Sequence, residues 1–322
     1  MARGSTAHRR LRSLSAALVL SAAPLGAESL RAFPTFVAGV EVVNLDLAVT
    51  DTRDRPVTNL AGSDLAVYED GVPQELCIFT QERLPLSLTI LLDGSSSMQP
   101  LITVAQAAAL RLIRTLGPTD EAQVAQFTRR LTVLQDFTSD RARLEAAVGR
   151  VVAEGETSLY AALYIALKEL VAGRRPGEDR RRAIVVLTDG EDTSSIVTEE
   201  QLLDLGRRSE VAVYAIGLRG APTPLASTVP VFFLTTLARE TGGRAWFPRA
   251  LGELDGVYGR IGEELRTLYG VGYVSGNSRR DGKWRAIAVR ALRANLLVRH
   301  RPGYYGPEPE ERRAFRSVAV RP

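Results

Sequence analysis

The apolar positions along the chain change their period near residue 86. Before it, apolar and polar residues alternate, as at Val43, Leu45 and Leu47, and a period of two is typical of a half-buried strand. After it, unbroken apolar runs alternate with stretches whose apolar residues recur every three or four positions. The pattern predicts a small β segment over residues 38–84, followed by strands that alternate with helices.

Residues 86–268 have the pattern of a doubly wound, Rossmann-like α/β domain with a mainly parallel sheet. Three strands with unbroken apolar runs suit a sheet that is covered on both faces by helices. Strands are predicted at 86–93, 122–127, 131–137, 182–189, 211–218 and 244–247. Helices are predicted at 102–116, 158–170, 199–209, 231–240 and 253–269.

The strands of the two flanks are predicted to form one small β-sandwich. Residues 38–84 include two short strands around Asp70-Gly71, a favoured hairpin dipeptide, and residues 270–306 return to the strand pattern. Neither segment has enough strands to bury a core alone, and chain ends often lie close in space. We therefore expect the two segments to pair, with the α/β domain inserted between them, and residues 307–322 to form a partly disordered tail.

The N-terminal 27 residues have the layout of a cleaved signal peptide. Four arginines precede a short apolar stretch from Leu14 to Leu20, and small residues extend it to about Ala27. The alternative, an uncleaved membrane anchor, would need about 20 apolar residues, and Pro24 interrupts the stretch. The sequence thus predicts an exported protein, periplasmic or secreted, with no other contact with the membrane.

The charge balance gives no reason to expect a nucleic-acid partner. The whole chain carries a formal charge of +4, and residues 1–27 contain four arginines and no acid, so the remainder is near 4 − 4 = 0. The basic excess therefore belongs to the targeting segment. Cys77 is the only cysteine, which rules out an intramolecular disulfide, and we expect it to be a small buried hydrophobe.

Two predicted strands end in acidic loops, and a third loop contributes a threonine. Asp93 opens the stretch DGSSSM, Asp189 opens DGEDTSS, and Thr157 stands at the start of a predicted helix. Ligands of open α/β sheets bind outside the carboxyl ends of the strands. If the strands are neighbours, five oxygen donors converge there, and a set without His or Cys suits Mg²⁺, Mn²⁺ or Ca²⁺. The donors are Asp93, Ser95, Ser97, Thr157 and Asp189.

This arrangement resembles the metal-ion-dependent adhesion site of von Willebrand factor type A domains. The family's first loop, Asp-x-Ser-x-Ser, maps onto Asp93, Ser95 and Ser97, its threonine onto Thr157 and its last aspartate onto Asp189. Family loops more often read Gly-Gly-Thr where this chain has Gly-Glu-Thr. The flanking β segments also resemble a bacterial family of exported proteins with a central type A domain, in which an aliphatic residue usually stands at the position of Cys77.

The resemblance implies a division of roles at the metal. The hydroxyls of Ser95, Ser97 and Thr157 would touch the ion directly, while Asp93 and Asp189 would act partly through water. One coordination position would stay open for an Asp or Glu side chain of a partner protein or peptide. We expect Ser95 and Thr157 to lie on exposed loops, outside the core.

Two other functions compete with metal-dependent binding. A structural exported protein with a vestigial metal site is one, and a Mg²⁺-dependent hydrolase or phosphotransferase is the other. A phosphotransferase of the haloacid-dehalogenase type needs a second aspartate two residues after the first, where this chain has Ser95. A serine hydrolase needs a histidine close to its reactive serine. Beyond the N-terminal segment only His300 remains, and it lies in a predicted tail strand. Binding is therefore preferred to catalysis, and the partner and oligomeric state stay open.

Overall fold

The computed structural model describes residues 42–175, 177–189, 192–218 and 229–309. All described residues belong to one compact unit. The predicted signal peptide and residues 310–322 of the predicted tail lie outside the described residues. Within those residues no helix has the length and apolar character needed to cross a membrane.

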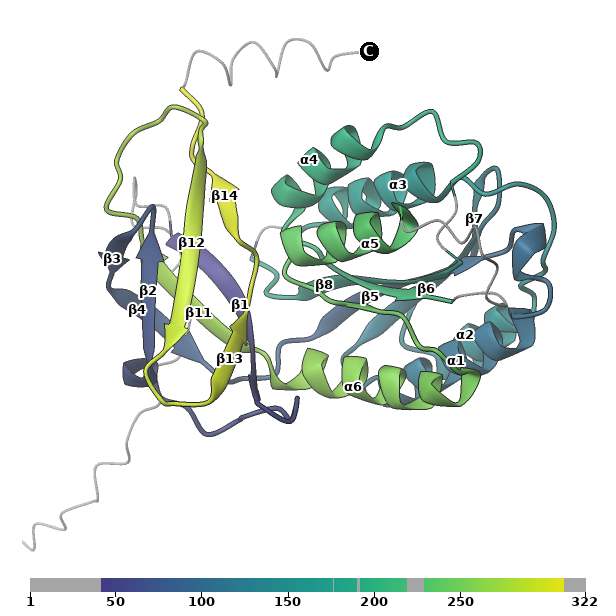
Figure 1. The fold of residues 1–322 in the computed structure, drawn as a ribbon, viewed down its shortest axis with the longest axis horizontal. Coiled ribbons are helices and arrows are strands. Elements are labelled where there is room, and N and C mark those ends of the chain that lie inside the picture. The colour runs from purple at the N-terminus through teal and green to yellow at the C-terminus, as the bar shows by residue number, and fades with distance from the viewer. Residues whose placement is uncertain (1–41, 176, 190–191, 219–228, 310–322) are drawn as a thin grey trace, which may run out of the picture. The chain divides into compact units, whose positions relative to one another are not determined.

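A six-stranded sheet forms the centre of the α/β part, in the order β10-β9-β8-β5-β6-β7 (Figure 1). All neighbouring pairs are parallel except β6 and β7, which are antiparallel. The mainly parallel sheet of the predicted fold class is thus confirmed. Its strands are β5 (Leu86–Asp93), β6 (Glu121–Phe127), β7 (Leu131–Thr138), β8 (Arg181–Thr188), β9 (Ala212–Gly217) and β10 (Ala245–Trp246).

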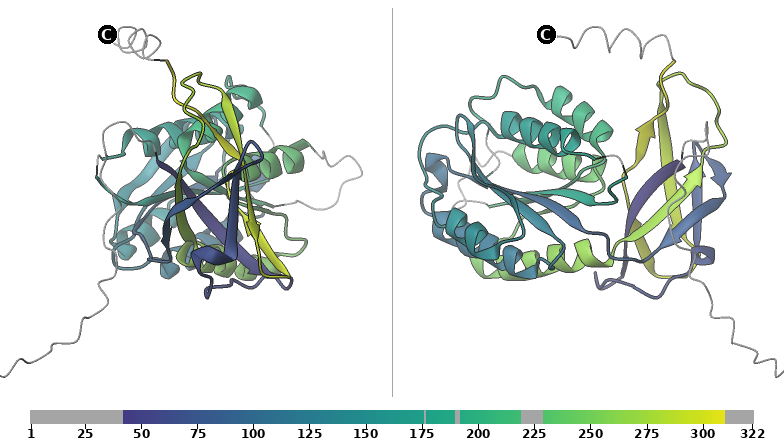
Figure 2. Two further views of the ribbon diagram at one scale, coloured as in Figure 1. Left: turned by 90° about the vertical axis from the view of Figure 1, so that its left-hand side faces the viewer. Right: turned by 180° about the vertical axis from the view of Figure 1, so that it is seen from behind.

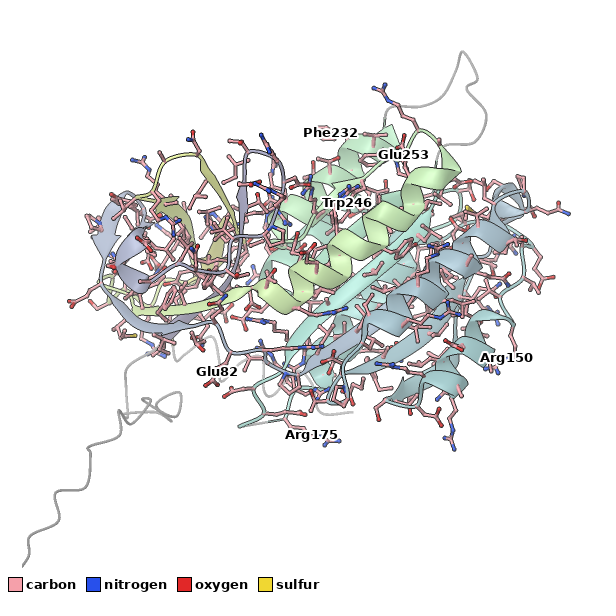
Figure 3. The ribbon with its side chains drawn as sticks, turned by 90° about the horizontal axis from the view of Figure 1, so that it is seen from below. Glu82, Arg150, Arg175, Phe232, Trp246 and Glu253 are labelled. Carbon is pink, nitrogen blue, oxygen red and sulfur yellow. The ribbon has the colours of Figure 1, made fainter. Side chains whose placement is uncertain are left out.

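Helices cover both faces of this sheet (Figures 1 and 2). Helices α1 (Ile102–Thr115), α2 (Arg141–Val148) and α6 (Leu254–Thr267) lie on one face, which Figure 3 shows from outside. Helices α3 (Leu159–Ala172), α4 (Glu199–Ser209) and α5 (Val229–Glu240) lie on the other. This two-sided cover explains why the central strands are apolar at nearly every position.

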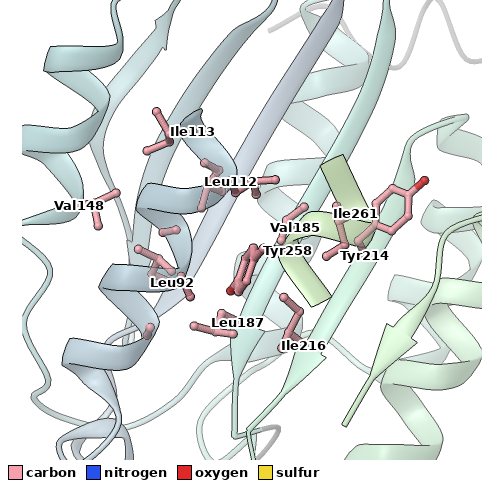
Figure 4. Packing of buried hydrophobic residues seen from close by; sticks show 14 of the residues in the cluster. Leu92, Leu112, Ile113, Val148, Val185, Leu187, Tyr214, Ile216, Tyr258 and Ile261 are labelled. Atoms are coloured by element: carbon pink, nitrogen blue, oxygen red, sulfur yellow. The ribbon is translucent and has the colours of Figure 1, made fainter. Parts of the chain in front are cut away.

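The central strand β5 shows how the period of two divides the core between the faces. Every residue of β5 is buried. Ile90 and Leu92 pack with α1, α2 and α6, whereas Leu91 packs with α3, α4 and α5. Figure 4 shows the first of these layers, in which Leu112 of α1 and Ile261 of α6 meet the strands. Alternate side chains therefore anchor helices on opposite sides.

The flanking strands form two four-stranded sheets that pack on one core, which confirms the predicted sandwich. One sheet has the order β13-β1-β11-β4 and the other β14-β12-β2-β3, so each combines N- and C-terminal strands. Inward-facing residues such as Leu47, Val67 and Tyr273 are buried in the shared core. The strands are β1 (Val42–Asp51), β2 (Leu65–Glu69), β3 (Val72–Gln74), β4 (Leu76–Thr80), β11 (Tyr269–Val274), β12 (Trp284–Ala291), β13 (Leu296–Arg299) and β14 (Gly303–Tyr305).

The sequence analysis missed two features of these elements. The stretch after the Asp70-Gly71 turn is not one strand, because it divides into β3 and β4, which belong to different sheets. Helix α2 was not predicted. Its first-turn amides are capped by Asp140, whose Oδ1 accepts from Ala142 N at 3.0 Å and Arg143 N at 3.3 Å.

Cys77 is exposed, so the expectation of a buried residue was wrong. The register of β4 shifts here, because Gly272 of β11 is opposite Ile78 while Tyr273 is opposite Leu76. Cys77 therefore has no opposite residue in the β4–β11 pairing. Its Sγ lies 3.4 Å from the carbonyl oxygen of Gly272. A bulge changes which side chains point inward, and sequence alternation alone does not reveal it.

Candidate metal site of the α/β domain

The two strands that carry the predicted aspartates are neighbours. β5 pairs with β8 in parallel, with Leu92 opposite Leu187, so Asp93 and Asp189 leave the same edge of the sheet. Strand order also reverses here: the chain proceeds from β5 to β6 and β7 on one side, then returns to β8 and β9 on the other. Such a switch point leaves a crevice between the loops, where α/β proteins bind their ligands.

The first loop is organised around the carboxylate of Asp93, which is fully buried. Its Oδ1 accepts a hydrogen bond from Ser95 N at 2.9 Å, and its Oδ2 accepts one from Thr188 Oγ1 at 2.5 Å. The hydroxyl oxygens of Ser95 and Ser97 lie 2.9 Å apart. Three of the five predicted ligands are thus brought together, and Thr188 ties them to the end of β8.

Gly94 permits the close packing of this loop. A Cβ at this position would lie 2.3 Å from Nε2 of Gln126 and 2.7 Å from the carbonyl oxygen of Val152. The Gly94 amide donates to the carbonyl of Phe127 at 2.8 Å, so the loop runs close against the end of β6. A side chain at residue 94 would push the loop away from that position.

Burial raises the pKa of Asp93 from 3.8 to about 6. Hydrogen bonds from Thr188 and Ser95 favour the ionised form, but they do not offset the loss of water around the carboxylate. The negative charge of Asp189 raises the pKa further, which places the two carboxylates in electrostatic contact. Among the described residues Asp93 has no basic partner, so an added cation would be favoured at this position.

The second loop brings Thr157 to the same edge of the sheet. Gly155 adopts a left-handed φ of +84°, and its carbonyl accepts from Ser96 N at 3.0 Å, which joins this loop to the first. Glu156 points outward and pairs with Arg129 at 2.8 Å. Thr157 itself is only 3% exposed.

The expectation that Ser95 and Thr157 lie on exposed loops was wrong. Ser95 is 1% exposed, and of the three hydroxyl residues only Ser97 is exposed. The reason is that the loops pack on each other and on the strand ends instead of extending into water. Substitution of Ser95 or Thr157 would therefore disturb packing as well as remove an oxygen.

The third loop follows β8. Asp189 is half-buried, and Gly190 and Glu191 lie outside the described residues. Asp192, three residues after Asp189, was not among the predicted ligands. Its Oδ2 accepts from Tyr160 N at 2.7 Å, and its Oδ1 accepts from Ser195 N at 3.0 Å. A sequence signal existed in hindsight, because Asp followed by Thr-Ser-Ser is typical of a turn closed by side-chain hydrogen bonds.

The donor set fits a hard divalent cation. In the described part of the chain no group of three or more His, Cys, Asp or Glu side chains is placed to hold a metal ion. The predicted set is different in kind, since it combines two carboxylates in electrostatic contact with hydroxyls such as the Ser95–Ser97 pair. Neutral and anionic oxygens of this kind are the ligands of Mg²⁺, Mn²⁺ and Ca²⁺.

A comparison with protein families identifies this part of the chain. Residues 88–191 match the family model of the von Willebrand factor type A domain. The chain contains a von Willebrand factor type A domain. The match begins within β5 and extends just beyond β8, and it includes all five predicted metal ligands. No curated protein matches the sequence.

Solved structures of similar fold come from several bacteria. One is an aerotolerance-related membrane protein from Bacteroides fragilis, at 20% identity and a TM-score of 0.46, covering 56% of this chain and 98% of that one. Another is a von Willebrand factor type A protein from Catenulispora acidiphila, at 13% identity and a TM-score of 0.49. The match covers 86% of this chain and 76% of that one. A third is the corresponding domain of the pilus tip protein Mfa5 from Porphyromonas gingivalis, at 12% identity and a TM-score of 0.46. The match covers 56% of this chain and 95% of that one. None of these likenesses indicates what this chain binds.

Proposed function

We propose that this protein is an exported module that binds another protein or peptide through a divalent metal ion. The hydroxyls of Ser95, Ser97 and Thr157 would hold Mg²⁺ or Mn²⁺, with Ca²⁺ as the other candidate. Asp93 and Asp189 would act partly through bound water. When bound, the ion would supply an open coordination position for an anionic oxygen of the partner. Export rests on the layout of residues 1–27 alone, and nothing in the α/β domain depends on it.

One observation supports this proposal above the others. The buried carboxylate of Asp93 is held by Ser95 and by Thr188 at the junction of β5 and β8, and within the described residues no side chain of opposite charge reaches it. A buried carboxylate without a cation is costly for a protein to maintain. The cost is explained if this cluster of oxygens is kept to receive a cation from solution.

The expected partner group is a carboxylate. Three of the five proposed ligands are neutral hydroxyls, so the charge of a divalent ion is not fully cancelled close to the metal. An Asp or Glu oxygen is attracted more strongly than a neutral carbonyl at such a position, because the buried surroundings screen charges weakly. This supports a partner that contributes one acidic side chain to the ion.

Catalysis is the weaker alternative. A hydrolase would need a histidine free to take a proton, and both ring nitrogens of His300 are engaged with the backbone of the β-sandwich. Its Nε2 accepts from Val289 N at 3.2 Å, and its Nδ1 lies 2.6 Å from the carbonyl oxygen of Arg301. A structural protein with a vestigial site is the second alternative, and the metal titration below separates it from binding.

The test uses two neighbouring serines of the first loop. Ser97 is a proposed ligand and Ser96 is not, and both are exposed, so Ser97→Ala and Ser96→Ala remove the same atom from adjacent positions. Mg²⁺ should raise the melting temperature of the unsubstituted chain and of Ser96→Ala by mass action. The rise should be much smaller for Ser97→Ala. Equal melting curves in saturating Mg²⁺ and in chelator for the unsubstituted chain would refute the metal site.

Partner binding would be tested with the same pair of variants. A pull-down from the exported fraction should recover a protein in Mg²⁺ and lose it in chelator and with Ser97→Ala. Replacement of single acidic residues of that partner should abolish the interaction at one position. Capture that persists undiminished in chelator would show that another surface is used.

A further inference from the structure

The loop before α3 and the loop after β8 are joined by a dense set of hydrogen bonds. The backbone of Thr157 is held from both sides: its amide donates to Thr193 Oγ1 at 3.1 Å, and its carbonyl accepts from the amides of Thr193 at 2.9 Å and Ser194 at 3.1 Å. The hydroxyls of Ser158 and Ser194 lie 2.7 Å apart. The position of Thr157 is therefore set by residues 193 and 194, which lie more than thirty positions further along the chain.

Asp192 organises the turn that makes these contacts. Its Oδ1 accepts from the amides of Ser194 at 3.3 Å and Ser195 at 3.0 Å, which closes the turn on itself. Its Oδ2 reaches across to the amide of Tyr160 at 2.7 Å. One carboxylate thus closes the turn and attaches it to the first turn of α3.

The first turn of α3 depends on this attachment. The N-cap residue, Ser158, makes no capping hydrogen bond with its own side chain. The amide of Tyr160 is capped by Asp192, and the amide of Ala161 donates to Ser195 Oγ at 3.0 Å. Two amides that an N-cap side chain would normally satisfy are instead satisfied from the loop after β8.

We infer that Asp192 is a positioning residue of the metal site. It holds Thr157 in place relative to Asp189. This inference rests on the proposed metal site. Thr157 and Asp189 belong to different loops, and the turn that begins at Asp192, three residues after Asp189, carries every described contact from that loop to the Thr157 backbone. Loss of the Asp192 carboxylate would free the turn and let the Thr157 hydroxyl move from its place.

The main alternative is that Asp192 only stabilises the fold by capping α3. Asp140 offers a control, because its carboxylate also caps first-turn amides, those of α2 from that helix's own N-cap position, and it belongs to none of the three loops. Both Asp192→Ala and Asp140→Ala should lower the melting temperature, since each leaves helix amides uncapped. Only Asp192→Ala should also weaken metal binding if the residue positions a ligand.

The experiment measures Mn²⁺ affinity of the full chain by calorimetric titration, at a temperature where every variant is folded. Asp192→Ala should weaken binding by about tenfold or more, as is typical when a residue that orients a ligand is lost. Ser195→Ala, which removes one capping hydroxyl, should weaken it less, and it replaces Asp192→Ala as the test if that variant fails to fold. Asp140→Ala should bind as the unsubstituted chain does.

A double variant tests whether Asp192 acts through Thr157. Thr157→Val keeps the side chain's shape and removes the proposed ligand oxygen. In that background Asp192→Ala should cost much less affinity than in the unsubstituted chain, because the group that it positions is already gone.

The outcomes separate this inference from the proposed function. If the unsubstituted chain binds Mn²⁺ and Asp192→Ala and Ser195→Ala bind equally well, Asp192 is structural and the inference is wrong. Full additivity with Thr157→Val would also overturn it. If the unsubstituted chain does not bind Mn²⁺, the metal site itself is wrong and the inference falls with it.

Discussion

The α/β domain and the β-sandwich each bury a carboxylate, and the two carboxylates differ in whether a basic side chain accompanies them. Glu69 of the sandwich is 2% exposed, and its oxygens accept from Tyr273 at 2.9 Å and Ser275 at 2.7 Å. Arg285, equally buried, lies 3.6 Å away and supplies the positive charge. Asp93 of the α/β domain has hydroxyl and amide donors and the charge of Asp189 nearby, but no arginine or lysine among the described residues.

This difference separates a structural polar cluster from a site prepared for a ligand. The charges of Glu69 and Arg285 cancel each other, so this buried pair needs no ion from outside. Asp93 and Asp189 of the α/β domain repel each other, and among the described residues no arginine or lysine pairs with the buried carboxylate of Asp93. Burial of charge alone therefore does not indicate function, whereas burial of charge without a partner does.

The largest expected effect comes from breaking the sandwich pair. Arg285→Met leaves Glu69 buried without a cation, and removal of one member of a buried ion pair typically costs about 3–5 kcal/mol. Urea denaturation should show a loss of that order in the free energy of unfolding. As a control, Glu69→Gln combined with Arg285→Met removes both charges and should recover a large part of it. A double variant no more stable than the single one would show that hydrogen bonding, and not charge, holds the network.

An intermediate effect of opposite sign is expected at Asp93. Because the pKa of Asp93 is raised to about 6 in the folded chain, its ionised form destabilises the metal-free protein as the pH rises through that value. Asp93→Asn keeps an acceptor for Ser95 N and removes the charge. In chelator at pH 7 it should raise the free energy of unfolding by up to about 3 kcal/mol, from a shift of about two units.

The same Asp93→Asn variant should show no rise in melting temperature on addition of Mg²⁺. The comparison between the two regions would fail if this variant were strongly destabilised in chelator, as Arg285→Met is expected to be. It would also fail if the melting temperature of Asp93→Asn still rose with Mg²⁺ as in the unsubstituted chain.

The smallest expected effect is a pH dependence that belongs to the sandwich. Burial lowers the pKa of His300 below 6.5, and its Nε2 accepts from Val289 N, so the folded chain favours the neutral ring. Below about pH 6.5 the unfolded chain takes up a proton more readily, and stability is lost as the pH falls. His300→Gln should flatten this dependence in urea denaturation between pH 7 and 5, by no more than about 1.4 kcal/mol per pH unit. Equal slopes for the two chains would contradict it.

Much of the fold could be predicted from sequence because burial has a simple period in regular elements. The apolar run of β5 and the stripe of α6, including Leu254, Ile261 and Leu265, lie in the core as expected. The same periodicity placed Asp93 and Asp189 at strand ends, and the parallel pairing of β5 with β8 brings them to one edge. Patterns that repeat over eight or more residues survive small local irregularities.

What only the tertiary structure decided lies in the irregular segments. The bulge at Cys77, the capping of α3 by Asp192 and the burial of Ser95 depend on contacts between segments far apart in the chain. The sequence by itself determined which residues form the sheet and which oxygens leave its edge. It could not determine how the loops pack, because turn residues have no period and their positions follow from hydrogen bonds to distant backbone groups.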